Sequence, residues 1–174
     1  MTDAHLHLLV NHLPIVGAAL STLLWGLALV TGGDRGALRA AALAAVFTGA
    51  GAAAAQLTGE PAEEAVERLP WADEALMHEH EERAEAATVV AVISGVLGLV
   101  AWGIAEKKDK GHIALTGAAL VGAIGTAGLM GWTGQAGGQI RHDEIRDGAP
   151  AGAMGPMGAA EAGAGEAGEE EDDD

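Results

Sequence analysis

Four long apolar stretches constrain the fold of this chain more than any other feature of its sequence. They run from about residue 8 to 30, 37 to 57, 86 to 105 and 113 to 133. Each is close to the ~20 residues that an α-helix needs to cross the hydrocarbon of a bilayer, and short charged segments separate them. We therefore expect an all-α fold, a bundle of four transmembrane helices, with the lipid bilayer as its main partner.

The residue types inside these stretches suit close helix packing in a membrane. Of the 174 residues, 27 are glycine, and aromatic residues make up only 3%. Small side chains let the backbones of membrane helices approach one another, whereas in a soluble domain they would bury little area. The chain has no cysteine, which excludes thiolate metal sites, iron–sulfur clusters and covalent haem attachment.

The acidic net charge of −16 excludes one class of function. Eight acids and no basic residue lie in 161–174, so residues 1–147 carry the other 17 acids and all nine lysines and arginines. No basic stripe remains on which a phosphate backbone could bind. We therefore expect no nucleic-acid partner. Residues 148–174, rich in glycine, alanine and acids, are predicted to be a disordered tail after a membrane domain formed by residues 1–147.

The basic residues predict how the chain is oriented. They are concentrated in the turns 31–39 and 106–111, whereas the segment 60–85 carries ten acids and only two arginines. The positive-inside rule places the two basic turns in the cytoplasm. We therefore expect a multi-pass protein of the cell (inner or plasma) membrane with both termini outside.

The same topology places the tryptophans and prolines. Trp25 and Trp102 are predicted at the inner interface, and Trp71 and Trp132 at the outer one, as two aromatic belts. Pro14 predicts either a kink in the first helix or a helix that begins near Asn11. A second proline, at position 61, predicts the start of a short surface helix in the outer acidic segment, residues 60–85.

The sequence also contains an internal repeat. A shift of 75 positions aligns Thr58-Gly59-Glu60 with Thr133-Gly134-Gln135, and His5 with His80. This predicts two duplicated helical hairpins, related by a pseudo-two-fold axis along the membrane normal. The last apolar stretch adds a series of glycines spaced by three, from residue 122 to 134. They predict a groove, either for tight helix packing or for a planar macrocycle.

Histidine is the residue type that says most about function. Six of the seven histidines lie at the expected outer ends of the helices: His5, His7, His12, His78, His80 and His142. A four-helix bundle brings these ends together, and imidazoles from different helices are axial ligands of haem. We therefore expect a site for haem b and electron transfer with His12 and His80 as ligands, and with His7 and His142 as further candidates. His12 is the deepest, so it needs a partner or a ligand.

Two other functions stay open. His78 and Glu82 are neighbours at i,i+4 on a helix and, with His5, form a candidate divalent-metal site. The small-residue helices also suit a non-catalytic subunit that packs in a larger membrane complex or in a homo-oligomer. No dinucleotide fingerprint, P-loop, zinc-protease motif or nucleophile elbow is present, so we assign no catalytic residue and leave enzyme activity open.

The opening from His5 to Pro14 resembles that of small, uncharacterised prokaryotic four-helix membrane proteins of the domain-of-unknown-function type. The Thr58-Gly59-Glu60-Pro61 segment, the His-Glu-His around Glu79 and the segment 138–142 are similar as well. The resemblance covers residues 5–145 and implies a four-helix membrane fold in which the outer-side residues matter, with no activity attached. A looser architectural similarity is to four-helix b-type membrane cytochromes, which implies haem b. This chain lacks the inner histidine pair for a second haem.

Overall fold

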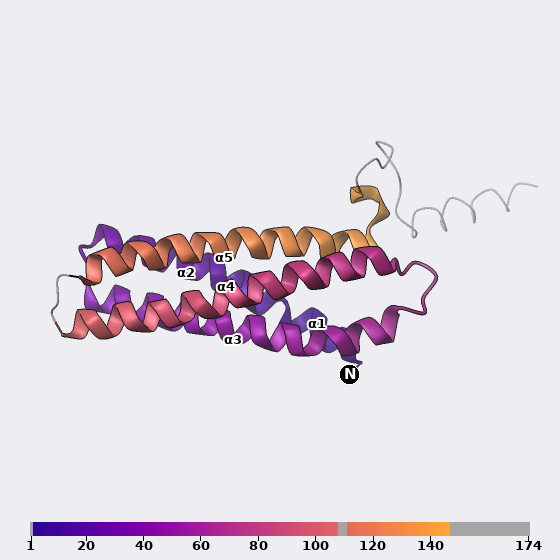
Figure 1. The fold of residues 1–174 in the computed structure, drawn as a ribbon, viewed down its shortest axis with the longest axis horizontal. Helices are drawn as coiled ribbons and strands as arrows, with labels where there is room; N and C mark the ends of the chain where they lie inside the picture. The colour runs from indigo at the N-terminus through magenta and orange to yellow at the C-terminus, as the bar shows by residue number, and fades with distance from the viewer. Residues whose placement is uncertain (1, 108–110, 147–174) are drawn as a thin grey trace, which may run out of the picture.

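The computed structural model describes residues 2–107 and 111–146, without the side chain of Asp143. The elements are α1 (Asp3–Val10), α2 (His12–Val30), α3 (Arg35–Val66), α4 (Glu74–Glu106), α5 (His112–Arg141) and a short 3-10 helix η1 (Asp143–Ile145) (Figure 1). No strand occurs among the described residues, and the predicted all-α four-helix bundle is confirmed. The tail predicted over 148–174 lies outside the described residues.

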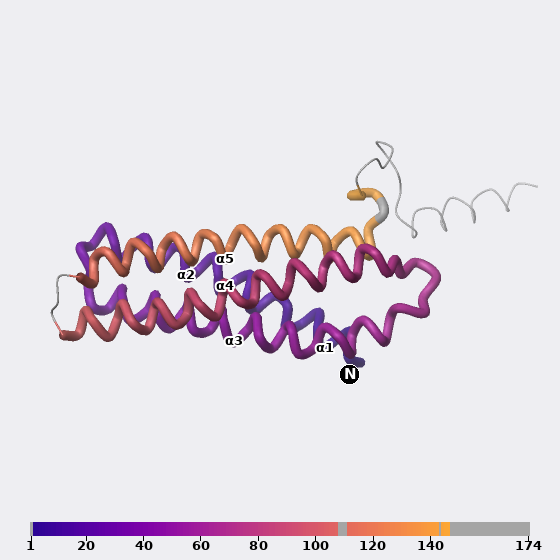
Figure 2. The backbone as a smooth tube through the Cα atoms, in the orientation of Figure 1, coloured from indigo at the N-terminus to yellow at the C-terminus, as the bar shows by residue number. Residues whose placement is uncertain are grey.

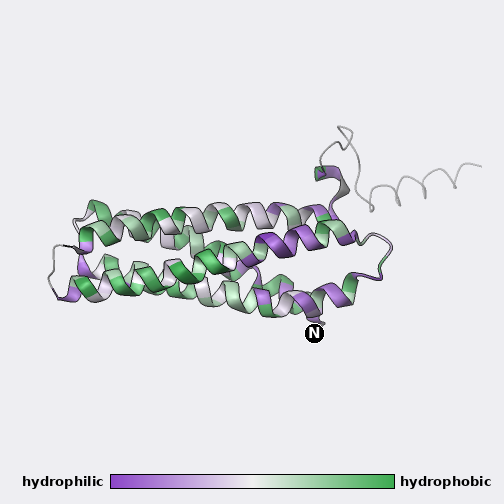
Figure 3. Cartoon of the chain, in the orientation of Figure 1, coloured by the Kyte–Doolittle hydropathy of each residue, from purple (hydrophilic) through white to green (hydrophobic). Residues whose placement is uncertain are grey.

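Four helical segments are long and apolar enough to cross a membrane: Asp3–Val30, Arg35–Val66, Glu74–Glu106 and His112–Arg141. They extend beyond the apolar stretches into polar residues, most visibly at one end of the bundle (Figure 3). Two aspartates outside the apolar stretches cap these longer helices. The Asp34 carboxylate accepts a hydrogen bond from the Ala37 N–H at 2.9 Å, and Asp73 accepts one from the Ala75 N–H at 3.0 Å.

The two prolines act differently from each other. α1 and α2 are separated by a break at Asn11, because Pro14 cannot donate a hydrogen bond to the carbonyl of Val10. The chain is helical on both sides of that break, so the first span is kinked and does not begin at Asn11. Pro61 lies inside α3 and does not begin a separate surface helix. Its ring is exposed, and the alanines and glutamates around it favour helix on both sides.

The four long helices form a closed ring. Each of α2, α3 and α4 packs against the helix that follows it, α5 closes onto α2, and α1 packs mainly against α3 (Figure 2). The α2–α3 connection lies at the same end as the start of α5, and we call this the turn end. The N-terminus, the α3–α4 connection and the end of α5 lie at the opposite end, which we call the histidine end (Figure 1).

The interior of the bundle is built from small residues, and large apolar side chains face outward. Within the described chain, every buried hydrophobic residue is alanine except Trp25, Leu38 and two methionines. Leu23 and Val121, by contrast, are 71% and 70% exposed. Hydrocarbon solvates such an outer surface, and helices in a membrane associate through small residues. This distribution supports a membrane protein.

Glycines bring α3 and α4 into backbone contact. A Cβ at Gly49 would lie 3.3 Å from the carbonyl oxygen of Ala91, and a Cβ at Gly95 would lie 3.2 Å from that of Ala45. Each position therefore packs a helix directly onto the backbone of its neighbour. Dispersion contacts of this kind hold membrane helices together when no hydrophobic drive exists between them.

The four helices share a local pattern at one small void in the bundle. Each helix contributes an alanine, and a hydroxyl three residues later, to this void: Ala18 and Ser21, Ala45 and Thr48, Ala91 and Ser94, and Ala123 and Thr126. The local offset between α2 and α4 is 73 residues (18 to 91), and between α3 and α5 it is 78 (45 to 123). Neither local offset equals 75, and the duplicated hairpins stay a prediction.

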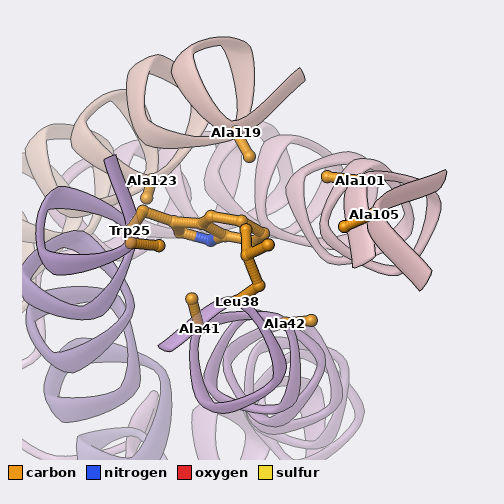
Figure 4. Close-up of a cluster of buried hydrophobic side chains, with 9 residues drawn as sticks. Trp25, Leu38, Ala41, Ala42, Ala101, Ala105, Ala119 and Ala123 are labelled. Atoms are coloured by element: carbon orange, nitrogen blue, oxygen red, sulfur yellow. The ribbon is translucent and has the colours of Figure 1, made fainter. Parts of the chain in front are cut away.

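A cluster that we call the Trp25 core lies toward the turn end, late in α2 and α4 and early in α3 and α5. Figure 4 shows its side chains. The Trp25 core consists of Trp25, Ala28, Leu38, Ala41, Ala42, Ala101, Ala105, Ala119 and Ala123. The Trp25 indole is fully buried among these alanines, so the prediction that it belongs to an interfacial belt is wrong. An indole ring fills the space that several alanines leave open, and this gain in packing outweighs its preference for the interface.

The other three tryptophans lie at the surface beside arginines. The guanidinium-to-ring distances are 5.6 Å for Arg39 and Trp102, 4.3 Å for Arg83 and Trp132, and 5.0 Å for Arg141 and Trp71. Such cation–π pairs suit a boundary where an apolar ring meets a charged group.

Candidate functional site

Two histidines from distant parts of the sequence face each other at the histidine end. His7 is on α1 and His80 is on α4, and their ring centroids are 6.5 Å apart with an angle of 87° between the ring planes. Both residues are partly buried. We call His7 and His80 the histidine pair. They are 73 residues apart, the same spacing that separates Ala18 of α2 from Ala91 of α4 at the small void.

Each ring is held through Nδ1 by the helix next to it. The Nδ1 of His7 lies 3.1 Å from the Thr58 hydroxyl of α3, and the Nδ1 of His80 lies 2.9 Å from the Thr133 carbonyl oxygen of α5. A carbonyl oxygen can only accept, so the Nδ1 of His80 carries a proton. The Thr58 hydroxyl donates to the carbonyls of Ala54 and Ala55 at 3.1 and 3.0 Å, and therefore accepts from His7.

These hydrogen bonds fix the tautomer of both rings. A neutral imidazole with its proton on Nδ1 has its lone pair on Nε2, the nitrogen that ligates a metal ion. Metal-binding histidines commonly donate their other N–H to a carbonyl or a similar acceptor, which orients the ring. The pair thus carries two Nε2 lone pairs, one on α1 and one on α4, that these hydrogen bonds leave unused.

Glycines lie next to both rings. A Cβ at Gly137 would be 2.9 Å from Cε1 of His80 and 3.1 Å from its Nδ1, so only glycine lets this ring pack against α5. A Cβ at Gly59 would be 3.8 Å from Cε1 of His7, an ordinary contact. The two glycines are 78 residues apart, the same spacing that separates Ala45 of α3 from Ala123 of α5 at the small void.

Polar atoms without partners gather in the same half of the bundle. Five buried side-chain atoms in the described part of the chain have no hydrogen-bond partner, and four of them are near the histidine end: Asn11 Oδ1, Gln56 Oε1, Arg83 Nε and Thr133 Oγ1. Leaving a buried polar atom unpaired costs about 1–3 kcal/mol. Such a concentration is typical of a binding site rather than of a packing core.

His12 does not join the histidine pair. Its ring is exposed, and its Nδ1 lies 2.7 Å from the carbonyl oxygen of Leu8, one turn earlier on the same side of the chain. His12 follows the break at Asn11, and its side chain is exposed at the surface, whereas the side chain of His7 is partly buried. The structure thus brings His80 together with His7, a candidate that the sequence ranked behind His12.

His142 is also remote from the interior. It is exposed at the C-terminal cap of α5, and its Nδ1 lies 2.9 Å from the carboxylate of Glu144. A hydrogen bond from the backbone N–H of Glu144 itself, together with the bond from His142, lowers the pKa of the Glu144 carboxyl. The pair is exposed and accounts for His142 as a surface residue.

The candidate divalent-metal residues are not assembled into one site. His78 Nε2 lies 3.4 Å from Glu82 Oε1, as expected for i,i+4 neighbours, but both side chains are exposed. His5 is exposed on α1, where its N–H bonds the Thr2 cap. Among the described residues, no group of three or more histidine, cysteine, aspartate or glutamate side chains is placed to hold a metal ion.

Arg83 links α4 to α5 at the histidine end. It lies one helical turn from His80 on α4, forms an ion pair with Glu79 and donates a hydrogen bond to the Trp132 carbonyl at 3.1 Å. Its ring contact with the Trp132 indole holds the guanidinium against α5. Arg83 therefore joins α4 to α5 near the Thr133 carbonyl to which His80 is bound.

The glycine series of α5 is mostly outside the bundle. Of its members, only Gly122 packs closely within the chain, with a Cβ position 2.8 Å from the Ser94 hydroxyl. The remaining four, Gly125, Gly128, Gly131 and Gly134, are exposed, and a Cβ at any of them would meet nothing within 4 Å. They neither pack this chain's own helices nor line the space between the histidines.

Sequence reasoning did not identify the residues that position the rings. Thr58 entered only as a landmark of the repeat, and Gly137 was not singled out. The available signal was a polar residue followed by glycine at the outer end of an apolar helix, which marks a place where a side chain from another helix can bond the backbone. No family model matches the chain, and neither a curated protein nor a solved structure is significantly similar to it.

Proposed function

We propose that this membrane protein binds one haem b between His7 and His80 and transfers single electrons through it. The observation that carries the proposal is the histidine pair itself. Two imidazoles, one from α1 and one from α4, have ring centroids 6.5 Å apart, and their Nδ1 contacts leave both Nε2 atoms for a ligand. The same two residues belong to the set of cofactor candidates that the sequence provides.

The spacing of the rings fits bis-imidazole ligation. With metal–nitrogen distances of ~2 Å, two imidazoles on opposite sides of one metal ion have ring centres roughly 6 Å apart. The centroids of the histidine pair are 6.5 Å apart. His7 and His80 would be the residues that hold a single metal ion at this separation.

The neighbouring residues fit a flat, largely apolar ligand. Gly59 and Gly137 keep side chains away from the edges of both rings, and the next layer inward consists of Ala18, Ala52 and Met130 with other small residues. When bound, haem supplies a one-electron couple. The chain's part is to hold the two nitrogens, exclude water from one side and supply no thiol, so the cofactor would be held without a covalent bond.

The basic turns support a location of this site on the non-cytoplasmic side. Arg35, Arg39 and Lys107 lie at the turn end, and the positive-inside rule assigns that end to the cytoplasm. The histidine pair lies at the opposite end, near the two termini of the described chain (Figure 1). The haem would therefore exchange electrons near the outer surface of the cell membrane, with both termini outside.

A second candidate function is a non-catalytic helical subunit of a larger membrane complex or of a homo-oligomer. The outward-facing glycines of α5 favour it, because exposed small residues at helical spacing allow another helix to approach closely. A divalent-metal role has less support, because no three-ligand group is assembled among the described residues. A packing subunit would be colourless and would co-purify with partners.

A haem titration separates these functions. Haem is added to detergent-purified protein, and the absorption spectrum is recorded before and after reduction with dithionite. We expect one equivalent to bind, with a Soret band and sharp α and β bands on reduction. His7→Ala and His80→Ala should each abolish the six-coordinate spectrum, and His12→Ala should retain it. An absence of stoichiometric binding, with partners recovered in the preparation, would favour the packing subunit.

A further inference from the structure

We propose that His7 is a releasable ligand, and that its departure opens a coordination position for a small diatomic molecule on a haem retained by His80. This inference rests on the proposed haem site and goes beyond electron transfer, because it assigns the protein a second, ligand-binding state. It follows from a difference between the two histidines of the pair.

The first difference lies in the hydrogen bonds. His80 donates to a backbone carbonyl of α5 at 2.9 Å, an acceptor that helix geometry fixes in place. The Nδ1 of His7 lies 3.1 Å from the Thr58 hydroxyl, an acceptor on a rotatable side chain. The same hydroxyl donates to the carbonyls of Ala54 and Ala55. The weaker and more mobile acceptor holds its imidazole less firmly.

The second difference lies in the helix that carries each histidine. His80 is in the second turn of α4, a helix of 33 residues that packs against both α3 and α5. His7 is on α1, which has only eight residues, none of them buried. α1 packs mainly against α3 and is separated from α2 by the break at Asn11, whereas α4 is held by two long neighbours. Short segments with few buried contacts open at low free-energy cost.

The third difference lies in the packing of the rings. The His80 ring packs so closely against Gly137 that a Cβ there would approach its Cε1 to 2.9 Å. The ring of His7 faces Gly59 across a looser contact of 3.8 Å. All three differences indicate the same result. The bond between the haem iron and His80 persists, and the bond between the iron and His7 is the one that breaks.

Carbon monoxide is the probe that tests this inference. Haem-loaded, dithionite-reduced protein is mixed with increasing carbon monoxide in a stopped-flow spectrometer. We expect the Soret band to shift at a rate that saturates at high carbon monoxide, because His7 must leave first. His7→Ala should retain haem and bind carbon monoxide at a rate proportional to its concentration, whereas His80→Ala should lose most of its haem.

A pair of threonine variants supplies a matched control. Thr58→Val removes the acceptor of His7 and should raise the saturating rate roughly three- to tenfold, the effect expected for one lost hydrogen bond. Thr22→Val should leave the rate unchanged, because the Thr22 hydroxyl donates to the Ala18 carbonyl within α2 and does not touch the histidine pair.

The outcomes distinguish this inference from the function on which it rests. A wild-type Soret band that stays unchanged under carbon monoxide would overturn the inference and leave the haem site standing. Equal loss of haem in His7→Ala and His80→Ala would overturn it as well. Wild-type protein that takes up no haem would overturn both.

Discussion

The two halves of the bundle are built from the same small residues but solve different problems. In the Trp25 core, one large indole fills the space between alanines, and Leu38 and the alanines around it are buried with little exposed surface (Figure 4). At the histidine end, the chain instead places imidazoles, threonines and an arginine between the helices. The half with the Trp25 core is filled by apolar side chains. The histidine end contains polar groups whose hydrogen bonds are incomplete.

The distribution of unpaired polar atoms makes the difference quantitative. Within the described residues the Trp25 core has one, the indole Nε1, and the histidine end has four. At about 1–3 kcal/mol each, the four represent a considerable cost that ordinary packing would remove. A dense core at one end and unpaired polar atoms at the other therefore distinguish the two halves along the length of the bundle.

Loss of His80 gives the largest expected effect and tests the binding half. His80→Ala should reduce the haem-to-protein ratio nearly to zero, because it removes the ligand that is most firmly held. The exposed His12→Ala is the control and should keep the wild-type ratio. Both are measured by pyridine haemochrome assay on purified protein. Equal retention by the two variants would show that the two halves do not differ in the way described.

Loss of Trp25 tests the packed half. Trp25→Ala should lower the free energy of unfolding by about 3–5 kcal/mol, because it leaves a large cavity among alanines that cannot close over it. Chemical unfolding in detergent, followed by circular dichroism, measures the change. Trp132→Ala, at the 48% exposed indole beside Arg83, should cost about 1 kcal/mol or less. A similar loss in both variants would contradict a core centred on Trp25.

A matched pair of glycine variants sharpens the comparison. Gly137→Ala places a Cβ 2.9 Å from Cε1 of His80 and should weaken haem binding about tenfold, equivalent to about 1.4 kcal/mol, because the ring must move. Gly134→Ala, where a Cβ meets nothing within 4 Å, should bind haem normally. Haem titration measures both. Normal haem binding by Gly137→Ala would show that the contact with α5 does not position the His80 ring.

The smallest effect is expected at Thr133. Thr133→Val removes a buried hydroxyl that has no partner while keeping the backbone carbonyl that binds His80. The free energy of unfolding of the haem-free protein should stay the same or rise by up to about 1 kcal/mol. Thermal unfolding in detergent provides the measurement. A clear loss of stability would mean that this hydroxyl is paired in solution, and that the count of unpaired atoms at the histidine end is too high.

The fold was accessible from the sequence because the bilayer dictates it. Four apolar stretches of sufficient length, separated by charged turns, can fold in few ways. The ends of the helices were less accessible, because helix continues past the apolar limit wherever alanine, glutamate and a capping aspartate such as Asp73 favour it. The position of Trp25 was missed because an average preference for the interface says nothing about a gap in one particular core.

The site was accessible only in part, for a geometric reason. Composition and position picked out the histidines, including both members of the pair. Depth in the apolar stretch favoured His12, but orientation around the helix axis decides which side chain enters the bundle. Residues 7 and 12 are five apart, which places them about 140° apart around a helix axis, so a helix that turns His7 inward turns His12 outward. The local offsets at the small void, 73 and 78, likewise could not be read from one uniform shift of the sequence.

Electron paramagnetic resonance of the oxidised, haem-loaded protein tests the central claim most directly. Axial imidazoles with perpendicular planes leave two iron orbitals nearly equal in energy and produce a strongly anisotropic low-spin signal, whereas parallel planes produce a rhombic one. The angle of 87° between His7 and His80 predicts the strongly anisotropic signal, from one iron per chain. A high-spin signal in the wild-type protein, or no haem signal, would contradict ligation by the histidine pair.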